Sequence, residues 1–209
     1  LRPDRSRAYV TNGARNTVSV VDTATHAVTT TIPAAGGPFR SAVSPDGARL
    51  YVVTGNGALK VLNLVTNTPS ATVDVGEPLT VGVSRDGQTV LVPRLNSTVV
   101  LVDTASNAIV ASLSVGPTPG QVVVSPVGNR AHVINFGDSS VSVIDTATRS
   151  LITTIPMPLG GSMGVFSPDG TRYYQGDTQD VTVVDTATNT VVATITGVGS
   201  TRALAIDPA

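Results

Sequence analysis

The sequence repeats one five-residue pattern, Val21-Asp22-Thr23-Ala24-Thr25. Whole or partial copies of this pattern occur at residues 62–66, 102–106, 144–148 and 184–188. A second pattern, Ser44-Pro45-Asp46-Gly47, alternates with the first and recurs at residues 84–87, 125–128 and 167–170. Each pattern returns every 40 to 42 residues, and two independent motifs with one period establish an internal repeat.

Each repeat is predicted to form four short β-strands. In the repeat that follows Pro38, the expected strands are residues 39–44, 50–54, 59–64 and 71–75. β-branched residues with partial alternation favour strands, and clusters of Gly, Pro and Asn-Thr between them mark turns. Four strands in about 40 residues are typical of one blade of a β-propeller.

The five repeats of about 41 residues predict one all-β domain over residues 1–209. We expect a five-bladed β-propeller of four-stranded antiparallel blades. The N-terminus aligns with the end of a first strand, and residues 203–208 read as a first strand that no further blade follows. This C-terminal strand is therefore expected to join the N-terminal blade and close the ring, which would pair an open sheet edge. The alternative is a fragment of a larger propeller, whose two ends do not meet.

The repeated polar residues are interpreted as turn residues. Proline fixes φ, aspartate can accept a hydrogen bond from the backbone two residues on, and glycine allows a positive φ. Equivalent aspartates in four repeats cannot all be one catalytic carboxylate. The only histidines are His26, expected in a turn, and His132, which replaces the tyrosine of Tyr51 in its repeat and is expected to half-pack between blades. Neither has a Ser or Asp partner at a suggestive spacing, so no histidine-based site is expected.

The composition excludes several classes of protein. Thirteen Lys and Arg against fourteen Asp and Glu give a net charge of −1, so no basic excess would neutralise a nucleic acid. The absence of cysteine excludes disulfides, thiolate nucleophiles and cysteine-bound metals. No apolar run is long enough to insert into a membrane. No phosphate-binding loop or dinucleotide motif occurs, and no cofactor is expected.

The strings Tyr9-Val10-Thr11-Asn12, residues 16–25 and residues 44–47 resemble the YVTN family of β-propeller repeats. The resemblance covers essentially the whole chain and implies a bacterial or archaeal protein that is extracellular, on the cell surface or periplasmic. Related propellers include surface-layer proteins, a streptogramin-inactivating lyase, and haem-d1 and copper oxidoreductases. Most such propellers have seven blades, so five is a departure from the pattern.

Functional residues are expected at one mouth of the propeller, where the links between blades and the loops between second and third strands gather. Residues that break the repeat are the better candidates. Arg40 and Arg202 could together clamp a carboxylate or phosphate, the alternative being that both are solvated rim residues. The other ligand-binding candidates are Gln121, Phe39 and Arg94.

No metal site is expected from the sequence. The weak candidates are Asp177, Asp180 and Asp138, whose oxygens could suit Ca²⁺, although their spacing matches no standard loop. The alternative is that all three are solvated turn residues.

These observations favour a non-enzymatic binding or structural module, monomeric as a domain, that engages a protein or cell-wall partner through the mouth loops. One alternative is a lyase or hydrolase related to the streptogramin-inactivating propellers, which would need a histidine with a carboxylate at the mouth. The single glutamate, Glu77, and the positions of the histidines count against it. A second alternative is a spacer domain of a larger surface protein.

Overall fold

The computed structural model describes residues 1–201 and 203–207. In these ranges nineteen strands form five antiparallel sheets, within which consecutive strands pair. One short 3-10 turn, η1 (Gly13–Arg15), follows the first strand. The four-strand repeat predicted from the sequence is thus confirmed for four sheets, while the first sheet has three strands.

The strands have the following bounds. The first sheet contains β1 (Arg7–Asn12), β2 (Thr17–Asp22) and β3 (Val28–Pro33). The second contains β4 (Pro38–Val43), β5 (Arg49–Thr54), β6 (Ala58–Asn63) and β7 (Thr68–Asp74). The third contains β8 (Gly82–Val83), β9 (Thr89–Arg94), β10 (Thr98–Asp103) and β11 (Ile109–Ser114). The fourth contains β12 (Pro119–Val124), β13 (Arg130–Asn135), β14 (Ser140–Asp145) and β15 (Ser150–Pro156). The fifth contains β16 (Met163–Phe166), β17 (Arg172–Gly176), β18 (Val181–Asp185) and β19 (Thr190–Ile195).

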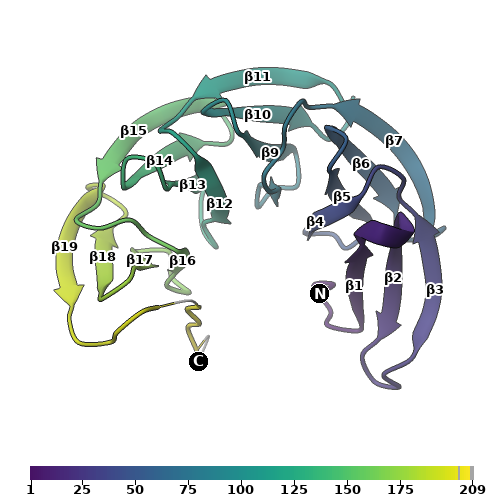
Figure 1. The fold of residues 1–209 in the computed structure, drawn as a ribbon, viewed down its shortest axis with the longest axis horizontal. Coiled ribbons are helices and arrows are strands. Elements are labelled where there is room, and N and C mark those ends of the chain that lie inside the picture. Colours follow the sequence, from purple (N-terminus) through teal and green to yellow (C-terminus); the bar gives the residue numbers. More distant parts are fainter. Residues whose placement is uncertain (202, 208–209) are drawn as a thin grey trace.

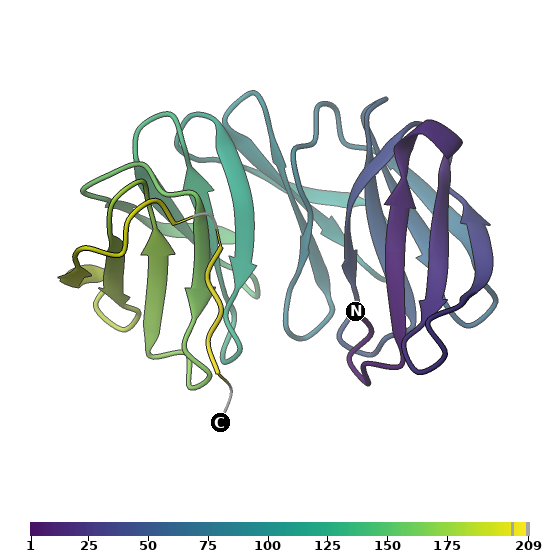
Figure 2. The ribbon, with the colours of Figure 1, turned by 60° about the horizontal axis from the view of Figure 1, so that its bottom comes forward.

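The five sheets stand side by side around a common centre (Figure 1). The strands β4, β12 and β16 lie innermost, and β3, β7, β11, β15 and β19 form the outer rim. This is the arrangement of a five-bladed β-propeller. Figure 2 shows the same blades turned forward, with the first and fifth sheets at the two ends of the arc.

The repeated motifs form the turns at one end of each blade, as predicted. Asp22 Oδ1 accepts the backbone N–H groups of Ala24 and Thr25 at 3.0 and 2.8 Å. These bonds, that of Thr25 first, hold the pKa of Asp22 below its ordinary value. Equivalent pairs of bonds are made by Asp103, Asp145, Asp185 and, at the same position of the second sheet, Asn63. In the other motif, Gly47 adopts a φ of +70°, which explains the glycine.

Apolar side chains fill the space between neighbouring sheets. Each inner sheet has one face toward the sheet before it, here called its back face, and one toward the sheet after it, its front face. Between the first and second sheets, Val20 and Ile32 of the first pack with Leu50 and Val52 of the second, and all four are fully buried. Because Val, Ile and Leu fill these interfaces, the low aromatic content does not weaken the core.

The expected closure of the ring is not formed among the described residues. Residues 203–207 make no strand, and the first sheet keeps an unpaired inner edge at β1. Leu204 instead lies beside Gly176 of the fifth sheet. Its Cδ1 is 3.5 Å from the position that a Cβ would take if residue 176 had a side chain. The first and fifth sheets are separated by the open side of the arc (Figure 1). Residues 203–207, which follow the fifth sheet, therefore do not pair with β1 across that gap.

Candidate functional site: the axial mouth

A cavity of about 680 Å³ lies at the inner ends of the blades, on the face where the inter-blade links gather. It is lined by Arg40 of β4, Gln121 of β12, Met163 of β16, Phe136 from the β13–β14 loop, and residues 79–81 before β8. Side chains from four different sheets therefore meet at one site. The repeat predicts this, because each first strand begins at the mouth and runs away from it.

Arg40 is the only charged residue that lines this cavity in the described part of the chain. Its side chain is exposed, and no hydrogen bond or ion pair engages its guanidinium among the described residues. The strand β4 fixes its place, since the backbone of Arg40 is in register with Val53 of β5. An unpaired guanidinium at the rim of a largely apolar cavity is suited to an anionic group, which it can bind through two parallel hydrogen bonds.

Gln121 lies half-buried on β12 and is oriented by the fifth sheet. Its Oε1 accepts the backbone N–H of Gly164 on β16 at 2.9 Å. This bond leaves the amide NH₂ group of Gln121 available as a donor at the cavity. The predicted candidates Arg40 and Gln121 are therefore brought to the same cavity.

Phe136 supplies an aromatic surface at the cavity, although the sequence did not single it out as a ligand-binding candidate. Phe136 is 44% exposed. It lies over Gly120, where a Cβ would stand only 2.0 Å from Cε2 of the ring. The backbone N–H of Phe136 also donates to the carbonyl of Thr118 at 3.0 Å, which ties the loop to the inter-blade link. The signal in the sequence was the break in the repeat at Phe136, together with the glycine at 120.

The other ligand-binding candidates lie elsewhere. Phe39 lines a separate cavity of about 510 Å³, with Glu77 and Leu95. Arg94 is engaged by protein groups, because its Nε donates to Thr98 Oγ1 at 2.9 Å and its Nη2 to Ser112 Oγ at 3.2 Å within its own sheet, and its Nη1 to the carbonyl of Val75 after β7 at 3.5 Å. Arg202 falls outside the described residues, so the expected pair with Arg40 has no described geometry.

Each of the three carboxylates considered for a metal accepts hydrogen bonds from nearby protein groups, Asp177 and Asp138 within their own loops and Asp180 from the segment after β19. Asp177 Oδ1 accepts the backbone N–H groups of Gln179 and Asp180 at 2.7 and 2.8 Å. Asp180 Oδ1 accepts the N–H of Gly197 at 3.2 Å, and Asp138 Oδ1 accepts the hydroxyl of Ser140 at 2.7 Å. Within residues 1–201 and 203–207 no three His, Cys, Asp or Glu side chains gather as metal ligands would.

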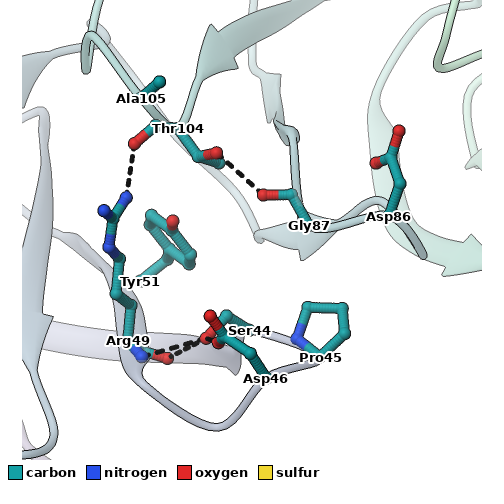
Figure 3. Close-up of a pocket in the computed structure, with 9 residues that line it drawn as sticks. All are labelled: Ser44, Pro45, Asp46, Arg49, Tyr51, Asp86, Gly87, Thr104 and Ala105. Carbon is teal, nitrogen blue, oxygen red and sulfur yellow. Dashed lines mark hydrogen bonds between the residues drawn. The ribbon is translucent and has the colours of Figure 1, made fainter.

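The opposite face carries a polar cavity of about 490 Å³ between the second and third sheets (Figure 3). Arg49 reaches across it and donates to the carbonyl of Thr104, whose hydroxyl donates to the carbonyl of Gly87 at 2.8 Å. Asp46 is held in its turn by the N–H of Ala48. The polar groups of this cavity thus hold the two sheets together.

The two histidines are both distant from the mouth cavity. His26 is exposed in the turn before β3. His132 is fully buried between the fourth and fifth sheets, where its ring centroid lies 4.7 Å from that of Phe166 and 4.5 Å from that of Tyr173. Burial, and secondarily the charge of Arg130, lowers the pKa of His132 from 6.5 to about 3. The predicted position between blades is confirmed, but the ring is fully buried rather than half-packed, and it sits in a cluster with the rings of Phe166 and Tyr173, whose own centroids are 5.2 Å apart.

No model of a protein family matches the sequence, and neither does any curated protein. No helix in the described ranges has the length and apolarity that crossing a bilayer requires.

Solved structures share the fold. Hydrazine synthase from Kuenenia stuttgartiensis superposes with a TM-score of 0.79 and 25% identity, over 91% of this chain and 63% of that one. Dihydro-haem d1 dehydrogenase NirN, in complex with DHE, gives a TM-score of 0.79 and 19% identity over 94% and 45%. A functionally unknown protein from Desulfotomaculum acetoxidans DSM 771 gives 0.82 and 20% over 97% and 69%. The chain spans between 45% and 69% of the length of these proteins, and it shares with them the β-propeller fold.

Proposed function

We propose that this propeller is a non-enzymatic binding module that engages its partner through the axial mouth. The observation that carries the proposal is the cavity in which the unpaired guanidinium of Arg40 lies with the exposed ring of Phe136, the side chain of Met163 and the amide of Gln121. One cation, one oriented amide and a larger apolar surface form a recognition site rather than an acid–base pair.

The partner of this mouth is a protein or cell-wall component that presents a carboxylate next to an apolar group. The carboxylate binds Arg40, and the apolar group lies against Phe136 and Met163. A charge-assisted hydrogen bond at such a site contributes about 1.5–3 kcal/mol, which corresponds to about a 10- to 150-fold change in affinity. The net charge of −1 supports a partner other than nucleic acid.

The repeat also supports a proposal for the repeat family and the cellular location of the protein. Residues 9–12 and the recurrent turn motif resemble the pattern of YVTN repeats. We assign the chain on that basis to the YVTN-type propellers and to the exterior of a bacterial or archaeal cell.

The test is binding of a set of short acetylated peptides with free C-terminal carboxylates and of peptidoglycan stem peptides, measured by fluorescence polarisation. The Arg40→Ala variant is expected to lose about tenfold or more in affinity. Arg15→Ala is the matched control, because Arg15 is an exposed arginine on η1 and does not line the cavity. Equal losses in the two variants, or binding that Phe136→Ala leaves unchanged, would contradict the proposal.

A further inference from the structure

The second cavity on the mouth face, here called the side cavity, adjoins the mouth cavity. It has a volume of about 510 Å³ and is lined by Phe39, Glu77 and Leu95, among others. Phe39 of β4 lines the side cavity, whereas the next residue, Arg40, lines the mouth cavity. The link between β7 and β8 is divided in the same way, because its residues 76–78 line the side cavity and residues 79–81 the mouth cavity. One strand and one link therefore form walls of both cavities.

Glu77 is the only charged residue that lines the side cavity in the described part of the chain. Its side chain is exposed, and no hydrogen bond or ion pair engages its carboxylate within residues 1–201 and 203–207. Arg94 lies close to the same link, but its guanidinium donates to Thr98, to Ser112 and to the carbonyl of Val75. The carboxylate of Glu77 is thus left without a cation among the described residues.

The backbone around Glu77 is held in place by the third sheet. The N–H of Leu95 donates to the carbonyl of Glu77 at 3.1 Å, and the N–H of Leu79 donates to the carbonyl of Pro93 at 2.9 Å. These two bonds fix the link against the end of β9 on both sides of Pro78. A carboxylate on a fixed backbone is presented at a defined place, so less ordering is needed when a ligand binds it.

The rest of the side cavity is apolar or has no side chains. Phe39 is 37% exposed and Leu95 is 54% exposed, so both offer apolar surface to a ligand. Gly57 and Gly76 leave the floor open, and a Cβ on Gly57 would stand only 2.4 Å from the carbonyl oxygen of Gly76. An aliphatic stem that ends in a positive charge fits such a surface, because the stem packs on apolar groups while its end reaches a carboxylate. The ring of Phe39 also favours a nearby cation.

The two cavities therefore carry opposite unpaired charges on either side of one strand. Arg40 is the charged residue of the mouth cavity, and Glu77 is that of the side cavity. The strand between them, β4, is the innermost strand of the second sheet (Figure 1). A ligand that carries one negative and one positive group can engage both cavities, and its second contact is then intramolecular. A ligand with a carboxylate alone engages only one of them.

We propose that the side cavity is a subsite for an ammonium or guanidinium group, so that the mouth selects extended peptide segments in which a lysine or arginine precedes the carboxylate. The inference rests on the proposed function, in which Arg40 binds that carboxylate. The peptide backbone crosses the start of β4, and the basic side chain lies on Phe39 and Leu95 with its charged end at Glu77. The partner is thus a segment with both charges rather than a purely acidic one.

The test uses acetylated peptides with a free C-terminal carboxylate that carry lysine one, two, three or four positions before the C-terminus. Norleucine peptides are the matched ligands, because norleucine keeps the aliphatic stem and lacks the ammonium group. Affinities are measured by fluorescence polarisation. At the best spacing, the wild-type protein should bind the lysine peptide about two- to fivefold more tightly than the norleucine peptide. The preference should shrink at about 0.5 M salt, because salt screens the charges.

Variants of Glu77 should change this preference and leave the norleucine peptides unaffected. Glu77→Gln should remove the preference, and Glu77→Lys should reverse it in favour of a glutamate at the same peptide position. Asp74→Asn is the matched control, because Asp74 is an exposed carboxylate near the link that lines neither cavity. The amide oxygen of the asparagine can still accept the N–H of Gly76, which Asp74 Oδ1 accepts at 3.1 Å.

Arg40→Ala separates this inference from the proposed function, since it should weaken lysine and norleucine peptides alike. A loss in Arg40→Ala with a lysine preference that Glu77→Gln leaves intact would overturn the side-cavity subsite alone. Arg40→Ala without effect on either peptide would overturn the proposed function, whereas a preference that Glu77→Gln still removes would support the subsite. No preference at any spacing, or an equal loss of preference in Asp74→Asn, would overturn the subsite. Failure of every peptide to bind would overturn both.

Discussion

The buried ring of His132 should make the stability of this propeller depend on pH above the range where carboxylates titrate. Neither ring nitrogen has a hydrogen-bond partner among the described residues. Because burial lowers the pKa of His132 from 6.5 to about 3, the folded protein keeps the ring neutral down to about pH 3. The unfolded chain takes up a proton below about pH 6.5. The free energy of unfolding is therefore expected to fall as the pH drops from 6.5 towards 3.

The size of this effect follows from the pKa difference. One pH unit below the pKa of the unfolded histidine costs about 1.4 kcal/mol, so at pH 5 the loss is about 2 kcal/mol. That is a large share of a typical free energy of unfolding of about 5–15 kcal/mol. Hydrogen bonds from backbone N–H groups, first among the causes, lower the pKa of the turn carboxyls Asp22 and Asp103 below 3.8. These aspartates therefore contribute little between pH 7 and pH 5.

The assay is urea unfolding followed by circular dichroism at pH 7, 6 and 5. The wild-type protein should lose about 2 kcal/mol over this range, whereas His132→Phe should lose almost none. At pH 7 the variant should also be more stable by about 1–3 kcal/mol, because two buried nitrogens without partners are removed. His26→Asn is the control, since Asn107 holds the same left-handed conformation at the equivalent turn. A wild-type stability that does not change from pH 7 to pH 5, or an unchanged slope in His132→Phe, would refute this reasoning.

Gly120→Ala should weaken ligand binding at the mouth by about tenfold, because the new Cβ would displace the ring of Phe136. The measurement is a binding titration of this variant. Gly55→Ala is its control, because the new Cβ there would meet no atom within 3.6 Å. Arg130→Ala should destabilise the protein by about 1–3 kcal/mol in urea unfolding, because its hydrogen bond to the carbonyl of Thr186 in the fifth sheet is lost, and an equal effect of Arg85→Ala in an exposed turn would speak against it. Asp145→Ala should cost about 1 kcal/mol through two lost turn bonds. Asp145→Asn should restore most of that stability, and failure to do so would show that the turn needs a charge.

Much of the fold could be predicted because the same turn motifs and strand-forming segments recur in every repeat. Asp22 and Asp46 recur at fixed spacing, so their turns could be assigned without knowing what the blades pack against. The β-branched runs between these turns then predict strands whose bounds agree with the structure to within a few residues.

The open arc and the exact membership of the mouth could not be predicted in this way. The sequence of residues 203–207 matches a first strand, but whether it pairs with β1 depends on how sharply successive sheets turn, which is a property of all the interfaces together. Phe136 reaches the cavity only because Gly120, in another strand, leaves room for its ring. Arg94 resembles a free mouth residue in the sequence, yet its guanidinium donates hydrogen bonds to its own sheet and to the carbonyl of Val75 after the second sheet. Such contacts arise between segments that are distant in the chain.

The pairwise links between sheets have a consequence for how the molecule comes apart. Each sheet packs on the sheets before and after it, through apolar residues and, at three interfaces, through a side chain that reaches a threonine carbonyl. Losing an inner sheet breaks two interfaces, whereas losing an end sheet breaks one, as in other chains of stacked repeats. Amide hydrogens of the third sheet should therefore exchange with solvent most slowly, and those of β1–β3 and β16–β19 should exchange first, by fraying from the two ends.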